Sequence, residues 1–300
     1  MNRRFQDILY APLFALFWVL AWMPLSVLYA IAHFLYFIVY YVIRYRRKVV
    51  HDNLARVFHD KSQTERDKME RDFYHHFVNY VVETIKLLHI SDEEMRQRME
   101  FVDAHVVDCY TTQGRSVMLL LGHYGNWEWI PSLTMWCQQP ENIHLGQIYR
   151  PLRNEWFDRL FLQLRGRFGT TCIAKNNSLR TLLQYKRMGD VSLTGFMADQ
   201  TPTGNSIHHW TTFMGQPTPV LTGFETIAKK LDMAVVYVDV ELVRRGYYRA
   251  TFRLLEDNPA ACPEYDITNR YVAAMERTIR RAPHAWLWTH KRWKHLPSQS

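Results

Sequence analysis

The stretch Ser116-Val-Met-Leu-Leu-Leu-Gly-His-Tyr-Gly-Asn-Trp-Glu128 changes character at Gly122. Residues 116–121 form a short apolar run of the kind that makes a buried strand. A helix is predicted from Asn126 through Cys137, and glycines at 122 and 125 give the backbone freedom for a turn between the two. The stretch therefore predicts a strand, a turn and a helix in immediate succession.

The same alternation continues downstream. Strands are predicted at 143–149, 170–174 and 191–197, helices at 155–168, 178–187 and 221–231, a hairpin at 234–243 and 248–255, and a closing helix at 267–281. This order predicts an α/β fold in which helices flank a mixed sheet. We expect residues 49–300 to form a single domain, with 49–110 as a helical lead-in. In that lead-in Ser62-Gln-Thr-Glu65 is a capping-box pattern, which marks a helix start.

The amino-terminal region is strongly apolar. From Ile8 to Ile43 there is no Asp, Glu, Lys or Arg in 36 residues. One helix of that length would reach ~54 Å, well beyond a ~30 Å hydrocarbon core, and Pro12 and Pro24 can each end or kink it. We therefore expect residues 1–48 to be a membrane anchor, made of one spanning and one interfacial helix. A re-entrant hairpin is the alternative.

A secretory signal peptide is the competing interpretation, because Arg3 and Arg4 precede the apolar run. The run is too long for one, and four basic residues follow it directly: Arg44, Arg46, Arg47 and Lys48. Basic residues next to a membrane segment favour the cytoplasmic side. The sequence therefore predicts an anchored protein whose main domain stays in the cytoplasm.

Composition narrows the classes of partner. Lys and Arg outnumber Asp and Glu by 37 to 29, which favours anionic partners such as phosphorylated lipid, an acidic carrier protein or nucleic acid. No nucleic-acid-binding pattern supports the last of these. The four cysteines are widely spaced, and neither a metal-ligand spacing nor a glycine-rich nucleotide loop occurs. We predict no metal and no cofactor.

His123 and Glu128 form the candidate chemical site. Positions five apart on a regular helix lie about 140° apart and do not face each other, so His123 must lie in the turn and Glu128 near the helix start. Glu128 can then accept a proton from one imidazole nitrogen and leave the other free as a base. Nearby helix amides can stabilise an oxyanion. The alternative is a structural histidine, because His-x4-Glu is common by chance.

Several motifs in order resemble the bacterial lipid A biosynthesis acyltransferases, the lauroyl/myristoyl transferase family. They are the Gly122–Glu128 stretch, Tyr149-Arg-Pro-Leu-Arg-Asn154, Ala198-Asp-Gln200 and Trp286-Leu-Trp-Thr-His-Lys-Arg-Trp-Lys294. That family is similar to glycerolphosphate acyltransferases, which share the His-x4-acid pattern. The Gln200-Thr-Pro continuation departs from other members of the family.

The resemblance implies a glycerolphosphate-acyltransferase-like fold at the cell inner membrane. It also implies transfer of a fatty acyl chain from acyl carrier protein to a hydroxyl of an anionic lipid A precursor. His123 would be the base, with Glu128 orienting it. Acyl transfer to phosphatidylinositol mannoside, ornithine lipid or a glycerophospholipid is an alternative. A non-catalytic, basic lipid-binding membrane protein is another.

The remaining candidates for substrate binding are Asn126, Arg150, Asn154, Asp158, Asp199, Lys291 and Arg292. Asp199 could contact Arg150 or His123, or be an ordinary turn aspartate. Asn154 and Asp158 can share a helix face, although a capping asparagine and a solvated aspartate explain them nearly as well. Lys291 and Arg292 belong to a basic, tryptophan-rich segment suited to phosphate and headgroup contacts.

Overall fold

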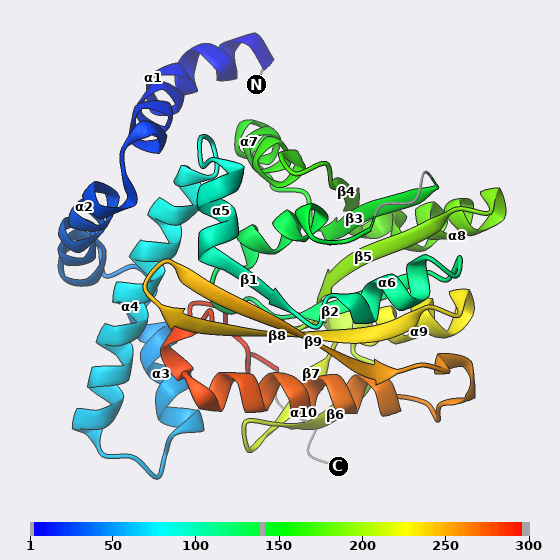
Figure 1. Cartoon of the computed structure of the whole chain (residues 1–300). Coiled ribbons are helices and arrows are strands. Elements are labelled where there is room, and N and C mark those ends of the chain that lie inside the picture. The colour runs from blue at the N-terminus through cyan, green and yellow to red at the C-terminus, as the bar shows by residue number, and fades with distance from the viewer. Residues whose placement is uncertain (1–2, 139–141, 296–300) are drawn as a thin grey trace.

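The structure, a computed structural model, describes residues 3–138 and 142–295 of the chain. Its centre is a seven-stranded sheet of order β1-β9-β8-β2-β5-β3-β4, flanked by helices (Figure 1). This confirms the predicted α/β fold with a mixed sheet. The strands are β1 (Met99–Val102), β2 (Val117–Leu121), β3 (Ile143–Tyr149), β4 (Thr171–Ala174), β5 (Val191–Met197), β8 (Ala234–Arg244) and β9 (Tyr247–Glu256).

Strand direction decides which side chains meet. Every neighbouring pair in the sheet is parallel except β8 and β9, which form an antiparallel hairpin. β2 lies between β8 and β5 and is buried along its whole length. Leu121 pairs with Met197, so β2 and β5 end side by side, at the side of the sheet where their carboxyl-terminal residues lie.

Helices flank the sheet (Figure 1). They are α3 (Arg47–Val57), α4 (Gln63–Lys86), α5 (Asp92–Arg98), α6 (His105–Thr111), α7 (Glu155–Gly166), α8 (Ser178–Met188), α9 (Gly223–Leu231) and α10 (Asp266–Arg281). α10 packs against β8 and β9, and α6 packs against β2, β5 and β9. The capping box at the start of α4 is present, with the Ser62 side chain accepting from the Glu65 amide.

The apolar amino terminus forms two helices, α1 (Arg3–Trp22) and α2 (Leu25–Phe37), and a π-helical turn at Ile38–Val42. Pro24 stands at the break between them, whereas Pro12 is contained within α1. The two helices lie at one corner of the molecule, and α1 extends beyond the main body (Figure 1). α2 packs one face against α4.

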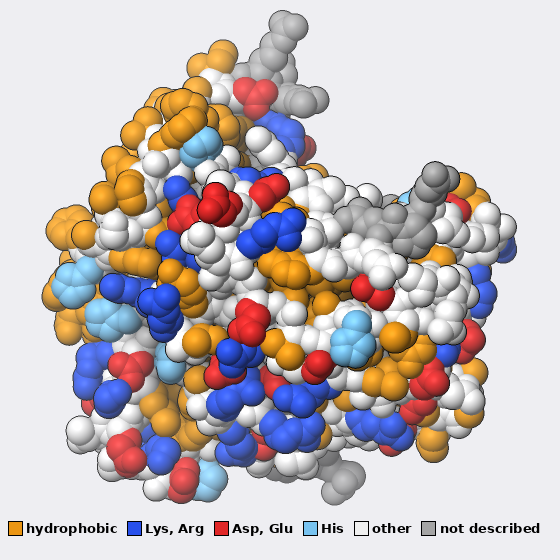
Figure 2. All heavy atoms as spheres, viewed as in Figure 1, with side chains coloured by type: hydrophobic (Ala, Val, Ile, Leu, Met, Phe, Trp, Pro, Cys, Tyr) orange, Lys and Arg blue, Asp and Glu red, His pale blue; other side chains and the backbone are white. Residues whose placement is uncertain are grey.

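The outward side of these helices is apolar and open to solvent. Phe34 is 65% exposed and Val42 is 76% exposed, and hydrophobic side chains dominate this corner in Figure 2. Leu25–Val42 is long and apolar enough to cross a membrane, judged by length and composition. The structure therefore has one candidate spanning segment next to a second apolar helix.

Three elements differ from the sequence predictions. A 3₁₀ helix at Trp127–Met135 replaces the longer predicted helix and contains Pro131, which cannot donate a helical hydrogen bond. β1 is a four-residue strand within the predicted helical lead-in. A separate hairpin, β6 (His209–Phe213) and β7 (Gln216–Val220), was not predicted, because Pro217 and Pro219 argue against a strand.

Candidate active site

The histidine loop, residues 122–126, joins β2 to the 3₁₀ helix at the edge of the sheet. Gly125 has φ +62°, a left-handed conformation that favours glycine. A Cβ on Gly122 would overlap the Met275 side chain, so no larger residue fits there without a shift of that side chain. The two glycines thus set the path of the turn that carries His123.

Asp199 holds His123 through both its backbone and its ring. The imidazole Nδ1 lies 2.7 Å from Asp199 Oδ1, and the His123 amide donates to Oδ2 at 3.0 Å. The indole of Trp286 also donates to Oδ2, at 2.8 Å. Burial opposes the charge on Asp199, but the charge of His123 and these hydrogen bonds outweigh it and lower the pKa of Asp199 to about 2. An ionised carboxylate therefore faces Nδ1.

The second imidazole nitrogen is placed for proton transfer. Because the Asp199 carboxylate can only accept, Nδ1 carries a proton and Nε2 of the neutral ring has a free lone pair. The amide of Gln200 lies 3.2 Å from Nε2 and can donate to it. The His123 side chain is 17% exposed, so a substrate can approach it. This geometry suits a general base.

Glu128 lies elsewhere. Its carboxylate is buried and receives two hydrogen bonds from Arg165 on α7, at 2.6 and 2.8 Å, and one from the Trp127 indole at 3.2 Å. The prediction that Glu128 orients His123 is therefore wrong, because Asp199 occupies the ring nitrogen that Glu128 was expected to hold. A direct part for Glu128 in a reaction stays a prediction.

The strand order explains why Asp199, and not Glu128, contacts His123. His123 is two residues beyond Leu121 on β2, and Asp199 is two residues beyond Met197 on β5, and those two positions are paired in register. Neighbouring parallel strands thus bring His123 and Asp199 together where both strands end. Asp199 was named as a possible contact of His123, but its partner could not be fixed without the strand order.

Three of the residues predicted to bind substrate have partners within the protein, and their part in binding stays a prediction. Asn126 is fully buried and donates to Glu83 Oε2 at 2.9 Å. Asn154 caps α7 by accepting from the amides of Trp156 and Phe157. Asp158 accepts from the Leu152 amide at 2.7 Å. In this conformation all three stabilise the loop and helix around them.

The basic candidates divide into exposed and buried residues. Arg150 directly follows β3 and is exposed, as is Lys291. Arg292 is buried, and its guanidinium donates to the Pro219 carbonyl at 2.9 Å. Burial lowers the pKa of Arg292 to about 10. Of the pair predicted to contact headgroups, only Lys291 is on the surface.

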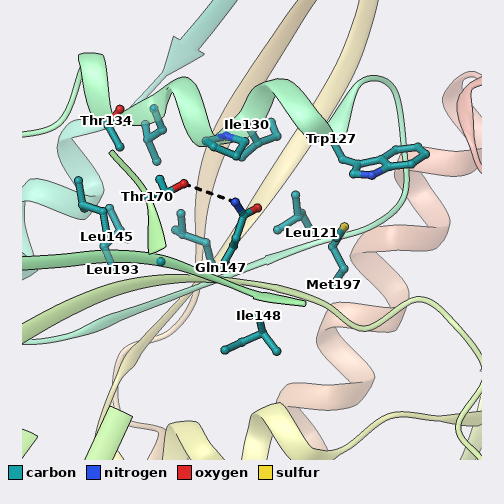
Figure 3. A pocket seen from close by; sticks show the side chains of 15 residues that line it. Leu121, Trp127, Ile130, Thr134, Leu145, Gln147, Ile148, Thr170, Leu193 and Met197 are labelled. Atoms are coloured by element: carbon teal, nitrogen blue, oxygen red, sulfur yellow. Dashed lines mark hydrogen bonds between the residues drawn. The ribbon is translucent and has the colours of Figure 1, made fainter. Parts of the chain in front are cut away.

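An apolar cleft lies beside His123, between the 3₁₀ helix and strands β2, β3 and β5 (Figure 3). Trp127 and Met197 are among its lining residues, and the centroid of the Trp127 ring is 5.2 Å from that of the His123 ring in an edge-on contact. The cleft is lined mainly by aliphatic side chains and two glycines: Leu119, Leu121, Ile130, Leu133, Leu145, Leu193, Gly146 and Gly195. Among its polar lining residues, Gln147 donates to the Thr170 hydroxyl.

Sequence reasoning missed several residues of this site. Gln200 and Trp286 were part of the quoted motifs without an assigned role, and Arg165 and Glu83 were not singled out. Nothing local marks them, since their partners are far away in the chain. Within residues 3–138 and 142–295 no group of three or more His, Cys, Asp or Glu side chains could hold a metal ion.

Comparisons with known proteins agree with the motif order. The family model described as bacterial lipid A biosynthesis acyltransferase matches residues 3–295. A curated relative from Haemophilus influenzae, named lipid A biosynthesis acyltransferase, is 24% identical over 146 residues. That alignment covers 49% of this chain and 43% of the relative, so the chain matches less than half of the relative's length.

Proposed function

The chain belongs to the bacterial lipid A biosynthesis acyltransferase family, and we propose that it moves a fatty acyl chain from an acyl carrier protein thioester to a hydroxyl of a lipid A precursor. The observation that carries the proposal is the His123–Asp199 pair next to an apolar cleft, whose lining residue Trp127 contacts the His123 ring. Such a transfer requires a base for the acceptor hydroxyl and an apolar surface for the acyl chain.

His123 Nε2 removes the proton from the acceptor hydroxyl as its oxygen attacks the thioester carbonyl. Asp199 stabilises the imidazolium that forms and stays ionised, as its low pKa allows. The tetrahedral intermediate then collapses: the carbon–sulfur bond breaks, the thiolate takes the proton from the imidazolium, and the ester remains. No covalent enzyme intermediate is needed in this scheme.

The acceptor hydroxyl would have to take the place of the Gln200 amide, which now donates to Nε2. The acyl chain would enter the cleft past Trp127, with its carbonyl next to His123. Buried methylene groups contribute roughly 0.8 kcal/mol each, so an aliphatic lining gives the donor much of its binding energy. Glu128 and Arg165 support this arrangement by fixing the Trp127 indole.

The surroundings support a lipid acceptor at a membrane. The exposed apolar faces of α1 and α2 suit insertion into the inner membrane, and basic residues follow them directly in the chain. Exposed Arg150 and Lys291 suit the phosphates of the lipid precursor. We propose a cytoplasmic orientation, since the acyl carrier protein would be reached there.

The proposal is tested by lipid A mass spectrometry in the native host, comparing wild type, a deletion strain and complemented strains. Deletion should remove one acyl chain, and wild type should restore it. His123→Ala should not restore it, and in a purified assay it should lower turnover by at least ~100-fold, the scale of lost acid–base catalysis. An unchanged lipid A in the deletion strain would reject the lipid A acceptor.

His144→Ala is the matched control. His144 also pairs with an aspartate, Asp190, at 2.8 Å, but it lies on β3 away from the histidine loop. It should complement fully. Full turnover by purified His123→Ala would reject the mechanism, and acylation of a different lipid in the same assay would keep the mechanism and change the acceptor.

A further inference from the structure

A buried carboxylate on α4, that of Glu83, binds the histidine loop. Glu83 is fully buried, and its Oε2 accepts from Asn126 at 2.9 Å and from the Tyr248 hydroxyl at 2.8 Å. Its Oε1 accepts from the Tyr29 hydroxyl at 2.9 Å. Three donors from three separate elements thus converge on one side chain.

The same face of α4 contacts the loop at other points. His76, seven positions before Glu83 and therefore on the same side of the helix, has its Nε2 3.3 Å from the Gly125 carbonyl. The Trp129 indole donates to the backbone carbonyl of Glu83 at 3.3 Å. α4 therefore supports the carboxyl end of the histidine loop and the start of the 3₁₀ helix that follows it.

α4 also holds the apolar helices. Tyr29, the donor to Glu83 Oε1, belongs to α2. One turn further along α4, the buried Lys86 ammonium donates to the carbonyls of Ala21 and Met23, at 3.0 Å each, where α1 ends. The membrane-facing helices and the histidine loop are thus fixed to the same short segment, Glu83–Lys86.

We infer that Glu83 is a positioning residue, which holds the histidine loop through Asn126 and ties it to the apolar helix α2 through Tyr29. The inference rests on the proposed function for its effect on turnover. It implies that the seating of α2 and the placement of His123 are coupled through one carboxylate.

The carboxylate is suited to this task because it accepts at both oxygens, whereas a glutamine side chain would turn one acceptor into a donor. Burial raises the pKa of Glu83, although the hydrogen bonds from Asn126, Tyr248 and Tyr29 oppose that rise. The other titratable or charged groups around it are Arg98 and, around the adjoining polar cavity, Asp72, His75, His76, Arg245 and His284.

The decisive variant is Asn126→Asp, which places two carboxyl groups face to face in a buried site. Turnover should fall ~10- to 100-fold with little change in KM for the acyl donor. It should partly recover as the pH is lowered, because a shared proton restores a hydrogen bond between the two groups. Wild type should show no such recovery.

The rescue variant is Glu83→Gln with Asn126→Asp, which reverses the direction of the same hydrogen bond. It should return turnover to within ~3-fold of wild type and abolish the recovery at low pH. A double variant no more active than Asn126→Asp, or unfolded like it, would overturn the inference. So would wild-type turnover in Asn126→Asp alone.

Hydrogen exchange at the histidine loop tests the coupling to α2 without any substrate. Tyr29→Phe should speed exchange of the loop amides at least ~10-fold, whereas Tyr36→Phe should leave it unchanged. Tyr36 is a second buried tyrosine on α2, but it stacks on Tyr40 and His75 instead of binding Glu83. Equal loop exchange in wild type and Tyr29→Phe would disprove the coupling. If wild type proved inactive, only the proposed function would fail, and this readout would still decide the inference.

Discussion

At the scale of single residues, Asp199 has the most demanding position. It accepts from the His123 ring, the His123 amide and the Trp286 indole while almost wholly buried. Each bond favours the ionised form, and together they overcome the cost of burying the charge. The Asp199 side chain therefore sets the tautomer of the His123 ring and also binds Trp286 from the carboxyl-terminal part of the chain.

Asp199→Asn should abolish most of the activity. If the Asn oxygen accepts from Nδ1, its NH₂ group must face the His123 amide and the Trp286 indole, which are both donors. We expect turnover to fall at least ~100-fold, measured in the purified acyltransfer assay. Asp190→Asn, which affects the His144 pair on β3, is the control and should retain activity.

The same variant has a predictable effect on acid stability. The folded-state pKa of about 2 lies below the ordinary 3.8, so ionised Asp199 contributes roughly 2 kcal/mol at pH values above both. That contribution is lost as the pH falls from about 4 towards 2. Urea unfolding in detergent at several pH values should show this acid-dependent loss in wild type and a weaker one in Asp199→Asn. Parallel curves would contradict the low pKa.

At the scale of elements, two strands of the sheet each place a glycine in the lining of the cleft. Gly195 on β5 and Gly146 on β3 both line it. A Cβ added at Gly195 would meet its nearest atoms, in Gln147, Gly146 and Leu121, at 3.9 Å, which is ordinary contact. A larger side chain at 195 can therefore enter the cleft without distorting the strand.

Gly195→Val should shorten the acyl chain that the protein prefers. The loss of room for about two methylene groups, at ~0.8 kcal/mol each, lowers kcat/KM for the longest good donor roughly 15-fold. Competition between acyl carrier proteins loaded with chains of different length measures the shift. Gly204→Ala, where no atom lies within 4 Å of the added Cβ, is the control. An unchanged preference would place the acyl chain outside this cleft.

Elements with local signals were predictable, and long-range partners were not. β3 and β5 were predicted with their observed bounds, because apolar residues recur along both short segments and each is followed by a helix or a loop in the α/β alternation. β7 was missed because two prolines occupy it, and its pairing with β6 is a tertiary property. In the site, the glycine-flanked loop marked His123 as a candidate residue. The contacts of Asp199 and Arg165 could not be predicted, because they depend on the strand order and on the position of α7. The spacing of His123 and Glu128 suggested a local pair where the sheet provides a distant one.

At the scale of the whole molecule, apolar surface gathers on α1 and α2. Leu16 is 52% and Phe34 is 65% exposed, on helices that otherwise pack against the protein. A continuous exposed apolar face of this kind suits a lipid environment. The basic residues that follow it place positive charge at the edge of that face.

Leu16→Asp with Phe34→Asp should release the protein from membranes. A charged residue at mid-membrane costs about 2.5–3.5 kcal/mol, so we expect the vesicle-bound fraction to fall at least ~10-fold in flotation assays. Met188→Asp with Leu254→Asp changes equally apolar, exposed residues away from these helices, at 63% and 46% exposure, and should leave binding unchanged. Equal loss in both pairs would mean that general surface hydrophobicity drives association.

The segment 282–288 is far from His123 in the sequence but forms hydrogen bonds with the site. Ala285 accepts from Gly125, Leu287 donates to the His123 carbonyl, and Trp286 reaches Asp199. During synthesis the apolar helices leave the ribosome before the α/β sheet and can enter the bilayer early, but His123 and Asp199 lack their contacts with Leu287 and Trp286 until that segment has also emerged. A nascent chain whose apolar helices had already entered a bilayer would thus hold an incomplete His123 site until the segment 282–288 has been made.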